Sequence, residues 1–207
     1  MKGLKASELF HEKTNRTGLY NIMPIENIPS VIKFGILSNN KAEKLLHASV
    51  AMQEIQDLRD CIKVPGGLDL HDYANLYFDP RNPMMFKRKD DADQLCVLKI
   101  SIKILDKPDV IVADSNASSR YVRFYTPIEG IKMLDFNTVF MENWKDENQI
   151  VEWQQKASKC AEVLIPQSVP FNDVEAAFVV SEDSRNKLLS IGFDKPIAIN
   201  GKIFFRR

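Results

Sequence analysis

Aromatic rings, amides and charges are concentrated in residues 71–86, whose sequence is HDYANLYFDPRNPMMF. Tyr73, Asn75 and Tyr77 alternate with apolar residues, which is the period of a half-buried strand with polar-tipped side chains on one face. The two prolines that follow lack an amide donor and restrict the residue before them, so they end the strand in a rigid corner. The stretch predicts either the floor of a ligand site or a surface strand followed by a turn.

One acidic residue stands in a run that is otherwise apolar. Glu162 follows Ala161 and precedes Val163-Leu164-Ile165, and a carboxylate there must face solvent, a partner or a cleft, because burying an unpaired charge is costly. A glutamate at the solvent-exposed end of a strand is the simpler interpretation. Arg59 has a comparable alternative as a solvated cation at the end of a helix. These residues alone predict a polar cleft but not its reaction.

Several common catalytic sites are excluded because their residues are missing. The three histidines and three cysteines are scattered without metal-ligand spacing, which argues against a metal site. Pro65-Gly66-Gly67 lacks the further glycines and the lysine of a phosphate-binding loop. The nucleophile elbow of a Ser-His-Asp hydrolase is also absent. Arginines, tyrosines, asparagines and Glu162 remain as groups for chemistry without a metal.

The size and charge of the chain indicate its class. Its 207 residues, 44% of them hydrophobic, can bury one core, so we expect a single soluble domain over residues 1–207. Lysine plus arginine equals aspartate plus glutamate at 28 each, so any polyanion must be held by local patches. The odd number of cysteines and the lack of a signal peptide or long apolar run predict a cytoplasmic protein with no membrane segment.

Periodicity and breaker residues predict the elements that must position these groups. Residues 95–105 alternate most clearly and are predicted as a strand, and Asn200-Gly201 predicts a hairpin over 197–205. Residues 1–17 are interpreted as a polar lead-in and 118–148 as an irregular stretch, which inside a compact domain is more often functional than not. The order of elements predicts the α+β class. Further strands are predicted at 18–23, 73–78, 110–113, 161–165 and 176–180, and helices at 26–34, 40–58, 150–159 and 182–191.

Three blocks of the sequence resemble one protein family. They are LYNI at 19–22 with IENI at 25–28 and GIL at 35–37, the run from Ser49 to Met84, and AEVLIP at 161–166. Together they resemble the DarT family of bacterial toxins, which ADP-ribosylate bases in single-stranded DNA, over roughly residues 19–205. The resemblance implies an ADP-ribosyltransferase-like α+β fold, with a split mixed or antiparallel β-sheet core and flanking helices.

The resemblance also implies roles for individual residues. Glu162 matches the catalytic glutamate and Arg59 the catalytic arginine. Tyr77 matches a ring that packs on the nicotinamide of NAD+, and Asn21 matches a polar contact on the nicotinamide side, where the family usually has histidine. The amide of Asn21 can donate and accept hydrogen bonds but does not titrate as that histidine does. Further implied contacts to NAD+ are Tyr20, Ser49 and Asn116.

The chemistry of such a transfer agrees with those roles. Cleavage of the nicotinamide–ribose bond builds positive charge on the ribose, and a carboxylate near the ribose hydroxyls stabilises that charge. The acceptor base nitrogen is a poor nucleophile while protonated, and Arg59 is the cation that would stabilise it as its proton leaves. Rings and cations along residues 116–144, which match the family's substrate-recognition loop, would bind single-stranded DNA. The implied DNA contacts are Arg81, Met84, Arg120, Arg123 and Tyr125.

The resemblance implies an enzyme that uses NAD+ as a substrate, needs no metal, and transfers ADP-ribose to thymine or guanine of single-stranded DNA. It further implies the toxin of a toxin–antitoxin pair, whose partner is a macrodomain-type antitoxin similar to DarG that would remove the modification. Two alternatives stay open. One is a related transferase acting on RNA or protein, and the other is a catalytically inactive module that binds single-stranded DNA. Asn21 and Leu58, where the family tends to have a second arginine, are the departures that favour the inactive module.

Overall fold

A mixed eight-stranded sheet forms the centre of the molecule, whose computed structural model describes residues 3–44 and 62–206. The strand order is β10-β9-β4-β1-β3-β7-β5-β6, in which β10 runs parallel to β9 and the other neighbours are antiparallel. A small second sheet pairs β2 with β8. The strands are β1 (Gly18–Pro24), β2 (Ile36–Leu37), β3 (Tyr73–Tyr77), β4 (Leu95–Ser101), β5 (Ile111–Ala113), β6 (Phe124–Tyr125), β7 (Glu162–Pro166), β8 (Ser168–Val169), β9 (Val174–Val179) and β10 (Ile197–Ile199).

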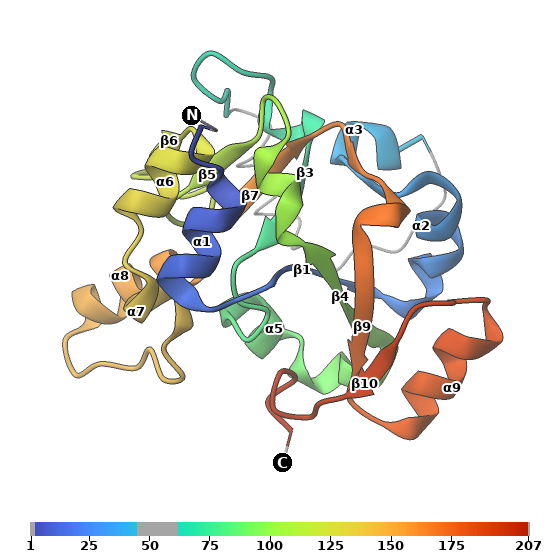
Figure 1. Cartoon of the computed structure of the whole chain (residues 1–207). Helices are drawn as coiled ribbons and strands as arrows, with labels where there is room; N and C mark the ends of the chain where they lie inside the picture. The colour runs from blue at the N-terminus through green and yellow to red at the C-terminus, as the bar shows by residue number, and fades with distance from the viewer. Residues whose placement is uncertain (1–2, 45–61, 207) are drawn as a thin grey trace.

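Short helices flank the sheet, which confirms the predicted α+β class. In Figure 1, α1, α6, α7 and α8 lie toward one side of the molecule, and α2, α3 and α9 lie toward the other. The α-helices are α1 (Ala6–Thr14), α2 (Ile28–Phe34), α3 (Asn39–Ala42), α5 (Pro83–Lys87), α6 (Pro127–Met133), α7 (Phe136–Phe140), α8 (Gln149–Lys159) and α9 (Glu182–Ser190). The 3-10 helices are η1 (Ile25–Asn27), η2 (Leu70–Asp72), η3 (Lys89–Gln94), η4 (Ile102–Asp106) and η5 (Phe171–Asp173).

The two halves of the large sheet meet at one residue pair. β1 is paired with β4 along its whole length, and β3 is paired with β7 along its whole length. Between β1 and β3, both of which lie entirely within the described residues, only Tyr20 and Tyr77 are paired. We call this junction the seam. Because the two strands share so little of a ladder, backbone groups beside the seam need other partners.

Alternation along the strands directs apolar side chains to both faces of the sheet. On β4, Leu98 belongs to the main core with α1 and α2, while Val97 belongs to a second cluster with Tyr77 and Phe204. On β3, Tyr73 and Tyr77 are also buried, as are the apolar residues between them. The half-buried strand predicted for 73–78 is therefore wrong in one respect, because both of its faces are covered.

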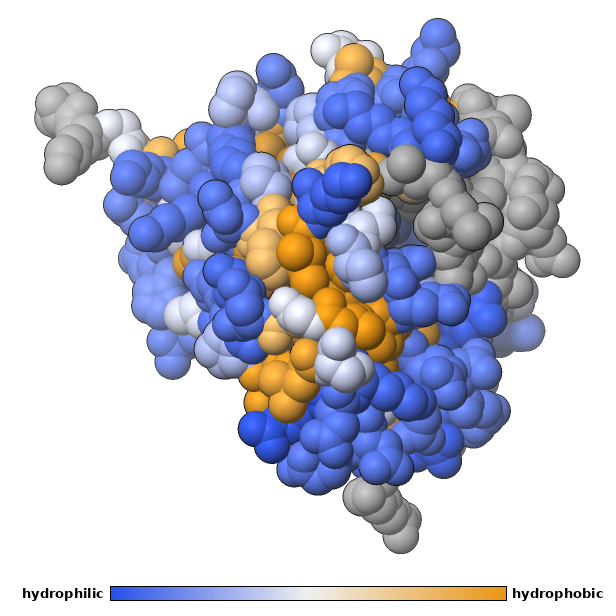
Figure 2. All heavy atoms as spheres, turned by 90° about the vertical axis from the view of Figure 1, so that its right-hand side faces the viewer, coloured by the Kyte–Doolittle hydropathy of each residue, from blue (hydrophilic) through white to orange (hydrophobic). Residues whose placement is uncertain are grey.

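One side of the molecule leaves some apolar surface uncovered. Figure 2 shows a band of apolar residues in the middle of the side where α2 and α9 lie in Figure 1, bordered by polar side chains. Phe34 at the end of α2 and Leu189 on α9 are among the exposed large apolar side chains. In α2 the side chain of Val31 is buried and that of Phe34 is exposed; in α9 the side chain of Leu188 is buried and that of Leu189 is exposed.

Two stretches predicted to lack regular structure contain helices. Residues 6–14 form α1, whose Phe10 is fully buried and lies 5.5 Å from the ring centroids of both Phe78 and Phe136. The lead-in prediction is wrong because tertiary contacts, chiefly the burial of Phe10 and Ala6, hold this helix without a complete apolar stripe. The segment 118–148 contains β6, α6 and α7, with Pro127 starting α6 and Asp135 capping α7.

The predicted C-terminal hairpin is wrong, and the strand predicted for 95–105 is shorter. β10 pairs in parallel with β9, and the residues after Asn200 turn without forming a second strand. Phe204 is fully buried in the cluster of Tyr77, which draws the chain inward. β4 ends at Ser101, and η4 then carries Ile104 into the core. The other predicted strands and helices are confirmed to within a few residues, except that most of the helix at 40–58 lies outside the described residues.

Neither a membrane-spanning helix nor a metal-binding cluster is found in the part of the chain that the structure describes. Across residues 3–44 and 62–206, no helix combines the length and the apolar composition needed to cross a membrane. In the same residues, no group of three or more histidine, cysteine, aspartate or glutamate side chains is arranged to hold a metal ion.

Candidate active site

A row of side chains crosses the sheet at the seam. Tyr20 of β1 is opposite Tyr77 of β3, Tyr77 is opposite Glu162 of β7, and Glu162 is opposite Ala113 of β5. Directly opposed residues project their side chains on the same face of a sheet. The two rings and the carboxylate therefore share one face, although their strands are far apart in the sequence. Residues 71–86, predicted as the floor of a ligand site, supply the middle of this row.

The carboxylate of Glu162 is fully buried. The alternative of a solvent-exposed glutamate at a strand end is therefore wrong. Its Oε1 accepts a hydrogen bond from the backbone N–H of Ala117 at 3.2 Å. Polar partners of this kind compensate a carboxylate for the loss of water. The loop that follows β5 is thus held directly against the buried acid.

The loop after β5 is a compact turn organised by Asn116. Its Oδ1 accepts hydrogen bonds from the backbone N–H of Ser118 at 2.9 Å and from the Ser118 hydroxyl at 2.6 Å. Its own N–H donates to the carbonyl of Ala157 in α8 at 3.2 Å. A turn closed by an asparagine side chain fixes the local backbone, and here it directs the Ala117 N–H at the buried carboxylate. Because Oδ1 of Asn116 already accepts hydrogen bonds within the turn, its Nδ2 group is the part of the side chain that can donate a hydrogen bond to a ligand.

Asn21 bonds across the seam and keeps one polar atom unpaired. Its Nδ2 donates to the carbonyl of Asn75 at 3.0 Å, where β1 and β3 have no ladder bond. Its Oδ1 is buried without a hydrogen-bond partner. The Asn75 contact fixes the orientation of the amide, because turning it over would oppose two oxygens. A buried unpaired acceptor costs free energy, so the seam offers an acceptor to a ligand that carries an N–H or O–H donor.

The surroundings of Tyr20 keep its hydroxyl protonated. Burial raises the pKa of the Tyr20 phenol above its ordinary value of 10, and the cations Arg16 and Lys99 offset this only in part. Lys99 is opposite Tyr20 on β4 and pairs with Glu175 at 3.0 Å. A neutral phenol presents a hydroxyl donor and an aromatic face, and both suit a nucleotide. Asn21 projects to the other face of β1, so the two side chains flank the seam from opposite faces.

A buried ion pair lies at the end of the β3–β7 ladder, beside the row. Lys159 ends α8 and is 1% exposed, and its Nζ donates to Asp79 Oδ2 at 2.7 Å and to the Val139 carbonyl at 3.1 Å. Asp79 follows Tyr77 by two residues, and Lys159 precedes Glu162 by three. This pair was not predicted from the sequence, because a lysine in the last turn of a helix is normally solvated.

Cys160 lies between this ion pair and the buried glutamate, yet it is poorly suited to nucleophilic chemistry. Burial and, to a lesser degree, the charge of Glu162 raise the pKa of the Cys160 thiol to about 12. Because the thiolate is the reactive form of cysteine, Cys160 is a small apolar packing residue near neutral pH. The polar chemistry near the start of β7 therefore belongs to Glu162.

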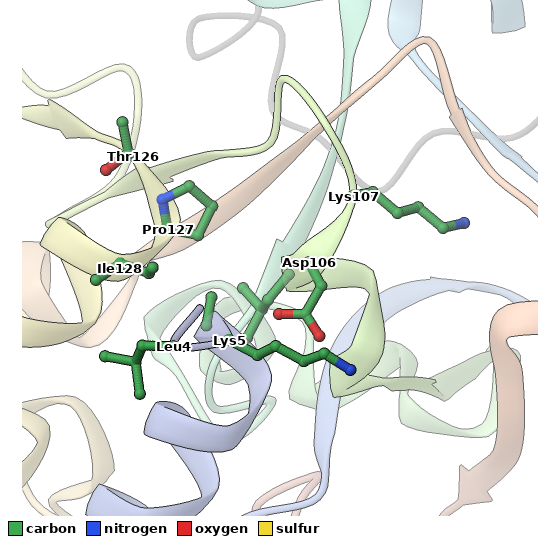
Figure 3. Close-up of a pocket in the computed structure, with 9 residues that line it drawn as sticks. Leu4, Lys5, Asp106, Lys107, Thr126, Pro127 and Ile128 are labelled. Carbon is green, nitrogen blue, oxygen red and sulfur yellow. The ribbon is translucent and has the colours of Figure 1, made fainter. Parts of the chain in front are cut away.

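A shallow groove elsewhere on the molecule is not this site. It has a volume of about 270 Å³ and lies where the starts of α1 and α6 meet the end of η4 (Figure 3). Its acid, Asp106, accepts hydrogen bonds from the N–H of Ser7 at 3.0 Å and from the Ser7 hydroxyl at 2.5 Å. These bonds satisfy the first turn of α1. No residue of the seam lines this groove.

Residues 20–205 match the family model described as ssDNA thymidine ADP-ribosyltransferase, DarT. The chain belongs to the DarT family. The match runs from β1 to the final turn, so it covers every element that contributes to the row and to the seam. The family and the ADP-ribosyltransferase fold predicted from the sequence are confirmed.

Two relatives described as DNA ADP-ribosyl transferases are similar to this chain over most of its length. A DNA ADP-ribosyl transferase–DNA ADP-ribosyl glycohydrolase fusion protein of Thermosipho africanus (strain H17ap60334) is 30% identical over 184 residues, which are 82% of this chain and 44% of that protein. This chain thus spans less than half of that relative. A DNA ADP-ribosyl transferase of Thermus sp. (strain 2.9) is 26% identical over 203 residues, which are 92% of this chain and 94% of that protein.

Solved DarT structures have the same fold. Thermosipho africanus DarTG in complex with ADP-ribose superposes with a TM-score of 0.80 at 27% identity, covering 92% of this chain and 52% of that one. Thermus sp. 2.9 DarT in complex with ADP-ribosylated ssDNA also gives a TM-score of 0.80, at 23% identity, covering 92% of this chain and 97% of that one.

The residues predicted to bind NAD+ in a DarT protein gather around the seam and the loop after β5. Tyr20, Tyr77 and Glu162 share the row, Asn21 bridges the seam, and Asn116 shapes the loop against Glu162. Two further predicted residues, Arg59 and Ser49, lie outside the described residues.

Three of the predicted DNA contacts lie between the loop after β5 and α6. Arg120 and Arg123 are exposed, and Tyr125 of β6 is half-buried. Tyr121 beside them is 81% exposed, the largest exposed fraction among the large apolar side chains described. This short stretch therefore presents cations and a ring to solvent next to the loop that contacts Glu162.

The other two predicted DNA contacts, Arg81 and Met84, pack against neighbouring segments. The Nε of Arg81 donates to the carbonyl of Lys202 at 3.1 Å, and its guanidinium carbon lies 4.1 Å from the centroid of the Phe205 ring. Met84 is partly buried beside the cluster of Tyr77. Arg81 thus contacts the C-terminal turn, and Met84 packs against the cluster that contains Tyr77. A direct contact of either residue with DNA stays a prediction.

Proposed function

We propose that this chain, as a single ADP-ribosyltransferase domain over residues 1–207, transfers ADP-ribose from NAD+ to thymine in single-stranded DNA. The observation that carries the proposal is the buried carboxylate of Glu162 opposite Tyr77 at the seam, in a chain of the DarT family. Structures of the Thermus sp. relative are complexes with NAD+ and with ADP-ribosylated ssDNA, which supports both substrates. The family description names thymidine, which supports thymine over guanine.

In the proposed reaction, the bond between ribose C1′ and the nicotinamide nitrogen breaks, and nicotinamide leaves with the bonding electrons. Positive charge then develops on the ribose, and the Glu162 carboxylate stabilises it from a site from which water is largely excluded. NAD+ would enter the seam itself, with Tyr77 packing on the nicotinamide from one face of the sheet and the unpaired Oδ1 of Asn21 accepting a hydrogen bond from NAD+ on the other. A thymine ring nitrogen forms the new bond to C1′ and releases its proton to solvent water, while Arg59 stabilises the base as it becomes a nucleophile.

The acceptor strand is proposed to run along residues 120–125. Arg120 and Arg123 supply cations for the phosphates, and the exposed ring of Tyr121 supplies a surface on which a base can stack. The bond from the Ala117 N–H to Glu162 supports this path, because it ties the neighbouring loop to the acid that would act on the ribose. A strand bound there would present a base close to the NAD+ site.

The proposed partner is an antitoxin with the opposite activity. The Thermosipho africanus relative is a fusion of a DNA ADP-ribosyl transferase with a DNA ADP-ribosyl glycohydrolase, and this chain matches 44% of it. We therefore propose that a macrodomain-type, DarG-like antitoxin removes the ADP-ribose that this toxin adds. Because the proposed acceptor is DNA, we also propose that the protein acts in the cytoplasm.

The decisive experiment replaces the buried acid. Glu162→Gln keeps the shape of the side chain and removes its charge, so we expect transfer to fall by about 10²-fold to 10³-fold or more, the effect of removing one preorganised electrostatic group. The measurement is mass spectrometry of a single-stranded oligonucleotide containing all four bases after incubation with NAD+, together with nicotinamide release. Glu182→Gln, at an exposed surface pair with Arg185, is the matched control and should leave the rate unchanged.

Separate acceptors distinguish the alternatives. Modification of thymidine in the oligonucleotide, with RNA and protein unmodified, supports the proposal. Modification of RNA or protein alone would identify a different transferase that shares the NAD+ half of the site. Release of no nicotinamide by the wild-type protein, with or without DNA, would leave a binding module and would contradict an enzyme.

A further inference from the structure

Lys159 joins three parts of the molecule at one buried ammonium group. Its side chain is fully buried, and its Nζ bonds to Asp79 at the end of β3 and to the carbonyl of Val139 in α7. The same Nζ lies 5.8 Å from the ring centroid of Trp144, which is 7% exposed. Val139 and Trp144 both belong to the segment 116–144 that was predicted to recognise the DNA. The ammonium therefore links that segment to the two strands that carry Tyr77 and Glu162.

The energetics of this pair argue against a purely stabilising role. Taking two charges out of water costs several kcal/mol per ion, so a buried pair often contributes no more stability than well-packed apolar residues of similar volume. Asp79 is also tied locally, because its Oδ1 accepts a hydrogen bond from the N–H of Arg81 at 3.1 Å. Such a pair has one fixed geometry with directional bonds, and an apolar contact in its place would let the joined segments shift relative to one another.

The β3–β7 ladder does not depend on this pair, whereas the recognition segment gains a directional anchor from it. Backbone pairing continues from Tyr73 to Tyr77 along β3 and holds Glu162 opposite Tyr77 without any side chain of the ion pair. The carbonyl of Val139, in contrast, is bonded to the Lys159 ammonium. Loss of the ammonium should therefore disturb the acceptor side of the site more than the NAD+ side.

We propose that Lys159 is a positioning residue that couples the recognition segment 116–144 to the strands of the active site, so that transfer to DNA depends on it more than cleavage of NAD+ in the absence of DNA. This inference rests on the proposed function. It assigns Lys159 no contact with either substrate. Asp79, two residues after the end of β3, acts with it as the fixed anchor.

The test compares two reactions of the full chain in each variant. One is nicotinamide release from NAD+ without DNA, and the other is ADP-ribosyl transfer to a thymidine-containing single-stranded oligonucleotide. In the double variant Asp79→Leu/Lys159→Met, which leaves no unpaired buried charge, we expect transfer relative to release to fall about tenfold to a hundredfold, the cost of a small misplacement of a reactant. Lys159→Arg keeps the charge and should recover part of that ratio. Lys107→Met, which removes a surface pair with Asp173, is the matched control and should keep the wild-type ratio.

The outcomes separate this inference from the proposed function. A lower ratio in the double variant, or in Lys159→Arg if only that variant folds, with thermal unfolding confirming the folded state, supports the coupling role. A wild-type ratio in the folded double variant overturns it, as does a wild-type ratio in Lys159→Arg if only that variant is folded, because the pair would then be purely structural. A wild-type protein that releases nicotinamide but transfers nothing to DNA would instead overturn the proposed function, and the coupling role with it.

Discussion

The seam between β1 and β3 differs from the ladders on either side of it. β1 and β4, and likewise β3 and β7, are paired along their whole lengths, whereas β1 and β3 share only the pair Tyr20 and Tyr77. In the ladders the backbone N–H and C=O groups form hydrogen bonds with the neighbouring strand, and the side chains are mostly apolar. At the seam a side-chain amide takes the place of a ladder bond, and its oxygen is left buried and unpaired. We infer from this difference that the ladders contribute most of the stability, and we propose that the ligand binds at the seam.

The largest expected loss of stability comes from a ladder position. Ile100 on β4 is fully buried in the main core, so Ile100→Ala should lower the free energy of unfolding by about 2–5 kcal/mol through lost burial and the cavity that remains. Urea denaturation followed by circular dichroism measures this change. Ile199→Ala on the edge strand β10, where the side chain is 43% exposed, should change it by less than about 1 kcal/mol. A similar loss at both positions would contradict a core centred on β4.

At the seam the same kind of truncation should affect binding rather than stability. Asn21→Ala removes one hydrogen bond to Asn75 but also removes a buried unpaired oxygen, so the two effects on the free energy of unfolding oppose each other and should leave a change within about 1 kcal/mol. The loss of the acceptor should lower kcat/KM for NAD+ by about 10-fold to 100-fold, which is roughly 1.4–2.8 kcal/mol.

Two measurements on Asn21→Ala decide whether the comparison holds. Urea denaturation reports on stability, and the NAD+ dependence of nicotinamide release reports on kcat/KM. A variant that unfolds as easily as Ile100→Ala while keeping its kcat/KM would show that the seam is simply a weaker ladder. Asn21→Asp separates the acceptor from the donor of this amide. A carboxylate keeps the acceptor but has no donor for the carbonyl of Asn75.

The ladders were also the part of the fold that the sequence predicted best. Regular alternation and breaker residues located β1, β3, β5, β7 and β9, since each of these strands is bounded by turns and rich in apolar residues. The sequence did not predict that both faces of β3 are buried. Tyr73 and Tyr77 carry polar hydroxyl groups, and such side chains are common on protein surfaces as well as in cores. The hairpin prediction failed because Asn200-Gly201 specifies a local turn, whereas burial of Phe204 decides where the chain goes afterwards.

The site was predicted only in part, for a reason visible on α8. Its exposed residues include Ile150 and Trp153, while its buried residue is Lys159. A hydrophobic stripe normally marks the face of a helix that is turned to the core, whereas α8 exposes two of its large apolar side chains, so its sequence pattern does not indicate that Lys159 is buried. Glu162 was identified through the family resemblance, but its burial and its bond to Ala117 depend on tertiary contacts that no local pattern encodes.

The recognition segment offers a smaller test with a defined pH dependence. Asp135 caps α7 by accepting hydrogen bonds from the N–H of Asn137 at 3.0 Å and from the hydroxyl of Thr138 at 2.6 Å, and these bonds lower the pKa of the Asp135 carboxyl, the Thr138 bond most. Asp135→Ala should cost about 1 kcal/mol of unfolding free energy at pH 7.

The sign of the pH dependence follows from the lowered pKa. A carboxyl whose pKa is lower in the folded state contributes stability above its ordinary pKa, and that contribution is lost as the pH falls through the folded value. The difference between wild type and Asp135→Ala should therefore shrink below about pH 4. Because Asp135 is exposed, only part of the capping effect is electrostatic. A difference that grows on acidification would contradict the cap.

The smallest expected effect compares two buried thiols on either side of the seam. Cys96 lies in β4, between two paired strands, and Cys160 lies at the junction of α8 and β7. Burial raises the pKa of both thiols, so each should react with iodoacetamide only when its surroundings open. In urea below the unfolding transition, local opening should be easier at a helix–strand junction than inside a ladder. Cys160 should therefore be alkylated at least about threefold faster than Cys96, corresponding to a difference in opening free energy of roughly 0.6 kcal/mol, as measured by mass spectrometry of the peptides. Equal rates would mean that the junction of α8 and β7 opens together with the sheet, and would contradict easier local opening at that junction.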